Sequence, residues 1–133
     1  MNYRRVVITG TGVISCVGNT VPEFWDAVVN GRCGIGPVTL FDVTEYRTKI
    51  AGEVKNFDIT RFVSPKDAKH MDKFCQYAVA AAHEALADAG LPLRLEDAGI
   101  DPLRAGVLVA SGIGGMATLC ENALALETRG PGR

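Results

Sequence analysis

Two short, uninterrupted runs of apolar, largely β-branched residues stand out from the mixed pattern along the chain. Residues 5–9 (RVVIT) end at Gly10, and residues 106–110 (GVLVA) end at a corner rich in serine and glycine. A short apolar run bounded by such turn residues is typical of a strand covered on both faces, as in a parallel or mixed sheet. We therefore predict two buried strands at these positions.

A first helix is predicted immediately after Thr20. Glu23 follows Thr20 at the spacing of a capping box, Pro22 lies in the first turn, where a missing N–H is tolerated, and Gly31 is a natural stop. The apolar positions recur on one face of this helix: Phe24, Trp25, Val28 and Val29.

The clearest periodic segment is 72–89, whose apolar residues recur at helical spacing and which Gly90 closes. Its alanine-rich middle part has minimal side chains, so it permits close packing against a sheet or another helix. Ser64 as a cap, with Asp67 at the third position, predicts a short helix just before it. A last helix is predicted at 116–127.

Between these helices the pattern is weaker. Gly34, Gly36 and Pro37 indicate a loop, residues 49–54 are typical of one strand, and residues 91–102 form a polar connection. The resulting order of strand, helix, strand, helix, helix, strand and helix predicts an α/β domain.

Composition and charge narrow the class of protein. The chain has 133 residues, of which 47% are hydrophobic and 22% charged, as expected for one globular domain. The net charge of −1 predicts no global attraction to nucleic acid or to an anionic membrane. No apolar stretch approaches the length of a membrane span, and the N-terminal apolar run is too short for a signal peptide. We therefore expect a cytoplasmic protein.

Two glycine-bearing corners could suggest phosphate binding. The first is GTG at residues 10–12, but Ser15 stands where a dinucleotide fingerprint needs its third glycine, so a tight turn is favoured over nucleotide binding. The second, 111–115, lacks the lysine of a phosphate-binding loop and the spacing of a nucleophile elbow. It is interpreted as a corner that another backbone or a ligand approaches closely, with Ile113 able to line an apolar cavity.

Cysteine and histidine chemistry has little support in the sequence. Four separated cysteines without a CxxC pair are typical of buried, reduced thiols in a cytosolic protein. Cys16, between an expected strand and a capped helix, is the least implausible nucleophile. His70 and His83 share no metal-ligand spacing with each other or with a cysteine, so we predict no metal site and expect His83 to be packed against a neighbour.

A local cluster of basic residues lies in this near-neutral chain at helical spacing: Lys66, Lys69, His70 and Lys73. Because Asp67 and Asp72 are interleaved with it, the spacing alone favours a solvated helix face. The alternative interpretation is a docking patch for an acidic partner, which would speed association more than it would tighten binding.

A colinear series of short segments resembles the chain-elongating, type II β-ketoacyl-acyl carrier protein synthases. The segments are 4–10 (RRVVITG), 18–21 (GNTV), 33–37 (CGIGP), 41–42 (FD), 50–54 (IAGEV), 71–74 (MDKF), 76–78 (QYA) and 111–115 (SGIGG). They cover nearly the whole chain in the family's order and spacing. The series is specific, although no single segment would be.

The resemblance implies a thiolase-like, layered α/β/α/β/α fold, built from two similar halves and working as a homodimer, with no cofactor expected. Residues 1–133 would be an incomplete N-terminal part of that ketosynthase domain, ending before the nucleophile cysteine, so no catalytic residue is expected within them. In such enzymes an acyl chain passes from acyl carrier protein to the cysteine. Malonyl-carrier protein is then decarboxylated, and the carbanion attacks the acyl thioester.

Residue by residue, the resemblance implies two recognition features. Lys66, Lys69 and His70 match basic positions that meet the acidic acyl carrier protein, which reverses the preference for a merely solvated face. Ile113 matches the position that gates the fatty acyl pocket near the dimer interface. Cys16 stands where the family commonly has proline, which disfavours a catalytic role. A non-catalytic carrier-protein or partner-binding module and a type II polyketide ketosynthase remain open as alternatives.

Overall fold

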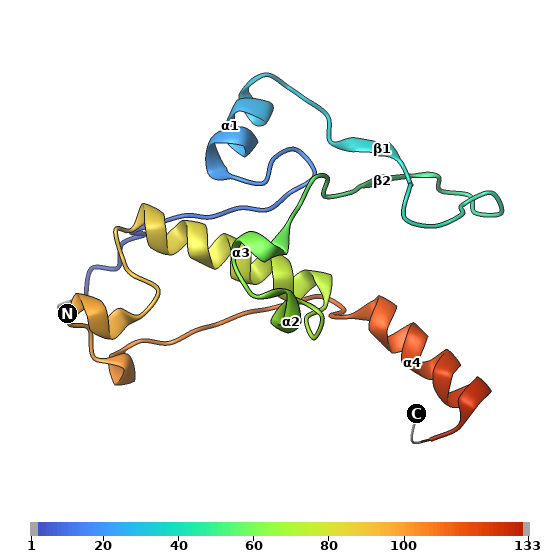
Figure 1. Cartoon of the computed structure of the whole chain (residues 1–133). Coiled ribbons are helices and arrows are strands. Elements are labelled where there is room, and N and C mark those ends of the chain that lie inside the picture. Colours follow the sequence, from blue (N-terminus) through green and yellow to red (C-terminus); the bar gives the residue numbers. More distant parts are fainter. Residues whose placement is uncertain (1–2, 132–133) are drawn as a thin grey trace.

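The computed structural model describes residues 3–131, and Figure 1 shows them as helices and short strands joined by long extended segments. Four α-helices are present: α1 (Val21–Val29), α2 (Pro65–Ala68), α3 (Lys73–Asp88) and α4 (Met116–Arg129). The two strands are β1 (Ile35–Pro37) and β2 (Ile50–Gly52). Three 3₁₀ turns complete the described part: η1 (Ile59–Arg61), η2 (Leu95–Ala98) and η3 (Pro102–Arg104).

Helix α3 is the element on which the centre of the molecule is assembled (Figure 1). The backbone around Gly10 and Gly12 approaches it so closely that a Cβ on either glycine would collide with the carbonyl oxygens of Ala85 and Ala81. The GTG segment is therefore not the tight turn predicted for it. Its glycines are required because this extended segment of backbone lies directly on the alanine-rich surface of the helix.

The acidic residues of α3 fix that extended backbone by accepting its N–H groups. Asp88 Oδ2 accepts from Thr11 N at 2.8 Å, and Glu84 Oε2 accepts from Val13 N at 2.9 Å. The other oxygen of Glu84 accepts from Val21 N, the first N–H of α1, at 2.7 Å. One partly buried carboxylate thus joins three segments of the chain.

The start of α1 confirms the predicted cap. Thr20 Oγ1 accepts from Glu23 N at 3.3 Å, and Glu23 Oε2 accepts from the backbone of Asn19 at 2.8 Å. The apolar face of this helix is largely exposed: Ala27 is its buried residue, and Trp25 is 64% exposed. Capping is local and is satisfied within a few residues, whereas burial of that face needs a partner that residues 3–131 do not provide.

The two strands form an antiparallel hairpin in which Ile35 pairs with Gly52 and Pro37 with Ile50. The second strand is confirmed within the predicted 49–54, but the loop predicted around Pro37 is wrong. Proline is tolerated at the end of a strand in a two-stranded pair, where its missing N–H faces away from the ladder. The hairpin continues beyond the strands, because Val38 N donates to Lys49 O at 3.0 Å, and the Glu53 carboxylate accepts from both Thr39 N and Thr39 Oγ1.

The strands predicted at 5–9 and 106–110 are wrong for this structure. Both segments are extended but unpaired, and the side chains of Val6 and Leu108 are 91% and 96% exposed. A strand must pair its backbone groups with a neighbour, and the described residues contain one sheet, which consists of β1 and β2 alone. Apolar patterning marks these segments, but nothing in residues 3–131 lies beside them as a sheet partner.

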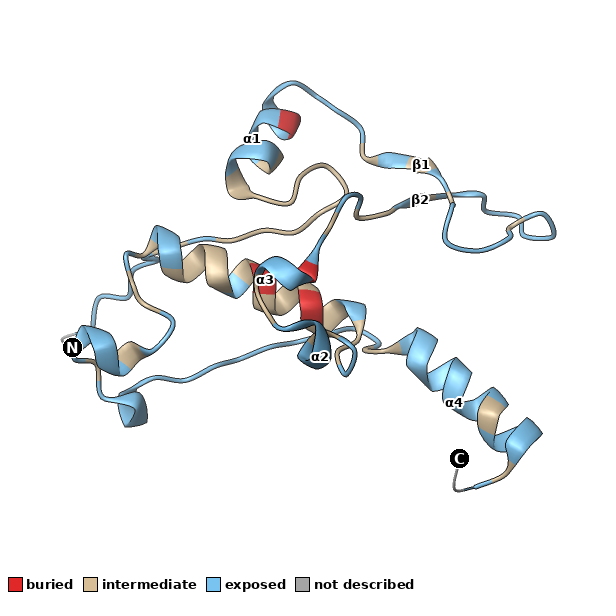
Figure 2. Cartoon of the chain, in the orientation of Figure 1, coloured by how far each residue is buried: buried red, intermediate tan, exposed pale blue. Residues whose placement is uncertain are grey.

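Figure 2 shows how small the buried core is, with a few buried positions around α3 and one on α1. Within the described residues, the buried apolar side chains are Ala27, Ile59 and Ala80. The accessible surface is 11111 Å², against roughly 6,700 Å² for a compact monomer of 14.1 kDa. The chain therefore leaves most of its apolar side chains in contact with solvent.

Candidate functional site

The predicted basic residues lie on α2 and on the turn that joins it to α3. Ser64 caps α2 as predicted, because its hydroxyl accepts from Asp67 N at 3.1 Å. Lys66 is on this single-turn helix, and Lys69 and His70 follow at its end. All three are exposed. They are not on one continuous helix, as their spacing suggested, since residues 69–72 separate α2 from α3.

The acidic residues interleaved with this cluster accept hydrogen bonds from hydroxyl groups. Asp67 accepts from the Ser64 hydroxyl at 2.7 Å, and Asp72 accepts from the hydroxyl of Thr118. Across the part of the chain that the structure describes, the one ion pair joins Arg32 and Asp26, far along the sequence from this turn. Lys66 and Lys69 are therefore available to an anionic group from outside the chain, whereas Lys73 Nζ donates to Gln76 Oε1 at 3.4 Å.

The side chain of a buried glutamine is hydrogen-bonded to the backbone of this turn. Gln76, on the first turn of α3, is 7% exposed and is the buried polar residue of the described chain. Its Nε2 donates to the carbonyl oxygens of Met71 at 2.9 Å and Ala68 at 3.2 Å, which bracket Lys69 and His70. Sequence reasoning missed it. The available signal was a polar residue one turn before Ala80, on the face of α3 that is buried.

The glycine-rich corner before α4 meets the same end of α3. Ser111 Oγ accepts from Gly114 N at 3.0 Å, and Gly114 has a positive φ of 79° and lies against Phe74. The backbone of Gly115 is so close to the Asp72 carboxylate that a Cβ would collide with it. This confirms the interpretation of the corner as a place where another part of the chain approaches closely.

Ile113, the expected pocket residue, lies within this corner and is 75% exposed. Its role in an acyl pocket stays a prediction. The structure does bring its loop and the basic turn to the same amino-terminal end of α3, because Asp72 contacts Gly115 and Thr118.

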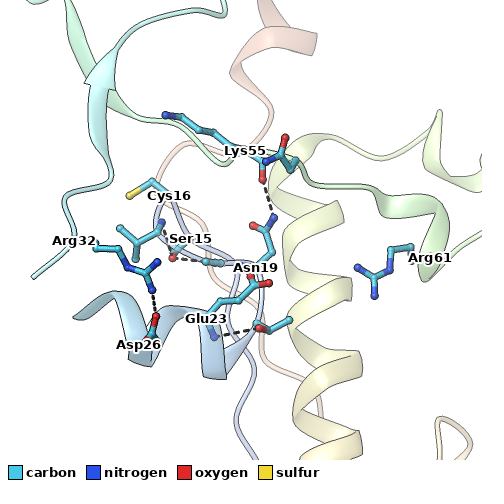
Figure 3. A pocket seen from close by; sticks show the side chains of 12 residues that line it. Ser15, Cys16, Asn19, Glu23, Asp26, Arg32, Lys55 and Arg61 are labelled. Carbon is cyan, nitrogen blue, oxygen red and sulfur yellow. Dashed lines mark hydrogen bonds and ion pairs between the residues drawn. The ribbon is translucent and has the colours of Figure 1, made fainter. Parts of the chain in front are cut away.

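A separate polar cavity of about 520 Å³ lies between α1 and the segment that follows β2 (Figure 3). In Figure 3, Arg32 and Asp26 point toward each other on one side, and the Asn19 amide donates to the backbone of Lys55 at 2.7 Å. Cys16 also lines this cavity. Its Sγ fills the space that a side chain at Gly34 or Gly52 would need.

Among the described residues, no hydrogen bond joins the Cys16 thiol to a base that would activate it. A reactive thiol is activated by an adjacent base, usually a histidine. The ring of His83 packs edge-on against Phe62 with 5.4 Å between ring centroids, as expected for a packed histidine, and His70 lies in the turn after α2. All four cysteines are free, but the expectation of buried thiols is wrong for Cys33 and Cys120, which are exposed.

Residues 3–131 contain no cluster of three or more histidine, cysteine, aspartate or glutamate side chains that could hold a metal ion. None of the described helices combines the length and the apolar character that crossing a bilayer demands.

Three carboxyl groups have lowered pKa values, and all of them lie outside the basic turn. Hydrogen bonds from Thr44 lower the pKa of Asp42, those from Thr39 lower the pKa of Glu53, and those from Thr60 lower the pKa of Asp58. These carboxylates stabilise turns. Burial raises the pKa of Tyr77, whose ring packs against Phe57 at 5.0 Å between centroids. The shifts therefore mark structural contacts rather than a reactive centre.

Comparison with known proteins covers almost the entire chain. Residues 3–131 match the family described as "Beta-ketoacyl synthase, N-terminal domain". The 3-oxoacyl-[acyl-carrier-protein] synthase 2 of Vibrio harveyi is 46% identical over 98% of the chain, and that of Synechocystis sp. is 42% identical over all of it. The chain spans 31% of the length of these relatives.

Solved structures agree with the sequence match. "The ishigamide ketosynthase/chain length factor" superimposes with a TM-score of 0.70 at 37% identity, covering 93% of this chain and 30% of that one. A "type II PKS acyl-carrier protein in complex with its ketosynthase bound to the hexaketide" gives a TM-score of 0.71 at 25% identity, covering 93% and 32%. The expected thiolase-like class of fold is thus confirmed, in partial form. This chain belongs to the β-ketoacyl synthase family.

Proposed function

We propose that this chain is the N-terminal part of a 3-oxoacyl-[acyl-carrier-protein] synthase that acts in fatty acid elongation. The observation that carries the proposal is the 46% identity to a synthase of that name, sustained over 98% of the chain. Action in the cytoplasm, assembly as a homodimer and independence of a cofactor belong to the same proposal. They rest on the family to which the chain belongs.

Within such an enzyme the chain serves recognition. Lys66, Lys69 and His70 meet the acidic surface of acyl carrier protein, and Ile113 lines the acyl pocket. The support for docking is that the lysines are exposed and without an ion pair in the described chain, while the nearby carboxylates accept hydroxyl hydrogen bonds. A complex of a related ketosynthase with its acyl carrier protein is consistent with such a partner.

The condensation itself requires groups that these residues do not supply. It needs a cysteine that accepts the acyl chain from the carrier thioester, and bases that assist loss of CO₂ from malonyl-carrier protein. We assign no catalytic residue to this chain. The purified chain, incubated with acyl- and malonyl-carrier proteins, should form no 3-oxoacyl product by mass spectrometry, and product formation would overturn this assignment.

The docking role is tested by binding. Reversing two charges with Lys66→Glu and Lys69→Glu should weaken binding of acyl carrier protein at least tenfold at low salt, because both cations are lost from the turn. The matched control is Lys49→Glu with Arg94→Glu, two exposed cations elsewhere in the chain. Equal affinity of the first double variant and the unchanged chain, measured by biolayer interferometry, would remove the docking role. Binding that persists in a chain without condensing activity also fits the alternative of a carrier-binding module.

A second candidate is a ketosynthase of polyketide synthesis. It is favoured by the two solved structures described above, one of which is a type II polyketide system. The two candidates differ in the carrier protein that they select. Tighter binding of a polyketide carrier protein than of a fatty acid carrier protein, at equal salt, would favour the second candidate.

A further inference from the structure

The turn that carries the basic cluster has little stability of its own. Helix α2 has 4 residues, and a single helical turn in isolation is unstable because nucleation fixes several residues for few hydrogen bonds. After α2 the backbone makes a tight turn, in which His70 N donates to Asp67 O at 3.0 Å and Met71 N donates to Ala68 O at 3.2 Å. These local hydrogen bonds are few, so a contact from outside α2 adds to the order of Lys69 and His70.

Gln76 supplies that support through both ends of its side-chain amide. The Nε2 group donates to Ala68 O at 3.2 Å and to Met71 O at 2.9 Å, so both of its N–H donors are used on the backbone of the turn. The Oε1 atom lies 3.4 Å from Lys73 Nζ, which donates to it. One buried amide thus contacts the backbone on each side of Lys69 and His70 and also the head group of a third cation.

The burial of Gln76 makes these contacts consequential. Burying an amide without hydrogen-bond partners costs folding free energy, so Gln76 is tolerated in the core because its hydrogen bonds are made. A hydrophobic residue would fill the same space without fixing the turn. The geometry therefore favours a role in organising the surface above the side chain, in addition to filling the core beside Ala80.

We propose that Gln76 is a positioning residue that pre-organises the turn bearing Lys69 and His70, together with the Lys73 head group, for an acidic protein partner. This inference rests on the proposed docking function. Binding to a pre-ordered surface avoids part of the entropy lost when flexible side chains and loops become fixed. The residue acts through the turn and does not itself touch the partner.

The test compares Gln76→Met with the unchanged chain, using purified acyl carrier protein as the probe. Methionine keeps the size and removes all three hydrogen bonds, so we expect affinity to fall about five- to tenfold, mostly through faster dissociation. Because every cation is retained, the dependence of affinity on salt should keep its slope. Amides of residues 69–71 should exchange with deuterium faster than in the unchanged chain.

The control is Ala80→Gly, one helical turn away on the same buried face, which weakens α3 without touching the turn. Its affinity should stay within about twofold of the unchanged chain. If Gln76→Met fails to fold, Gln76→Leu is used, since it also removes all three hydrogen bonds at similar size and adds no charge. The same loss of affinity is expected.

The outcomes separate the two proposals. If Lys66→Glu with Lys69→Glu leaves binding unchanged, the docking function itself is wrong. If that double variant loses binding while the Gln76 variant binds as the unchanged chain does, docking stands and the positioning role is overturned. An equal loss of affinity in Ala80→Gly also overturns it, because general weakening of α3 would then explain the effect.

Discussion

Helix α3 and the two extended segments at 5–9 and 106–110 carry similar apolar content but have opposite outcomes. The helix satisfies its own backbone hydrogen bonds, so it forms with whatever packing is available. The extended segments can satisfy theirs only against another strand, and within residues 3–131 they have none. In this chain, helices that satisfy their own backbone hydrogen bonds are formed, whereas segments that need a partner strand remain without regular secondary structure.

The largest difference in stability is expected when a glycine is replaced by valine in each of the two regions. Gly12→Val puts a side chain into the backbone of α3 and should lower the free energy of unfolding by about 3 kcal/mol or prevent folding. Gly106→Val lies in the open segment, where no atom is within 4 Å of the added Cβ, and should change stability by about 0.5 kcal/mol at most. Denaturation followed by circular dichroism measures both. A similar effect of the two substitutions would contradict the contrast.

A smaller effect is expected at the carboxylate that joins three segments. Glu84→Leu leaves the N–H groups of Val13 and Val21 without their acceptor, and should cost about 2 kcal/mol of stability. Glu121→Leu, on the exposed surface of α4, is the control and should be nearly neutral. The same urea titration compares them, and a neutral Glu84 variant would show that the extended backbone stays on α3 without this carboxylate.

Acid should loosen the hairpin before it affects α3. Hydrogen bonds from Thr39 depress the pKa of Glu53 below its ordinary value of 4.5, so their contribution is present above that pH and is lost as pH falls through the lower folded value. The amide of Thr39 should lose protection against exchange at such pH, while amides in the middle of α3 keep theirs. Glu53→Gln should remove this dependence. Retained protection of Thr39 at pH 2 would exclude the mechanism.

The smallest change in stability is expected where the chain is most open. Leu108→Lys replaces a side chain that already faces solvent, so the unfolding midpoint should stay the same. Self-association should fall, because an unpaired apolar segment offers its backbone to other chains and a lysine opposes such pairing. Light scattering across a concentration series measures this. Unchanged scattering would mean that other exposed residues drive association.

The local signals in the sequence were reliable where the structure depends on neighbours in the chain. The helix predicted at 72–89 is observed as Lys73–Asp88, and Ser64 and Thr20 cap the helices expected of them. The segments 5–9 and 106–110 were wrong because apolar patterning reports a preference for burial and not the presence of a partner strand.

The same distinction applies to the candidate site. That the basic residues lie together could be predicted from the sequence, since they are only a few residues apart along the chain. Their support could not, because Gln76 reaches back 5 and 8 residues to Met71 and Ala68, a contact that no periodic pattern encodes. Likewise, the glycines at 10 and 12 suggested a turn, whereas their partner is a helix more than 65 residues further along the chain.

The contact between Asp72 and the start of α4 has a consequence for how such sequences can diverge. The carboxylate accepts from the Thr118 hydroxyl and occupies the space beside Gly115 that any larger side chain would need. Substitutions at these three positions are therefore not independent: a chain that gains a side chain at 115 has to shorten the one at 72, and then gives up the acceptor for 118. Positions 72, 115 and 118 should covary among related sequences, and this joint constraint links the inheritance of the basic turn to that of the glycine-rich corner.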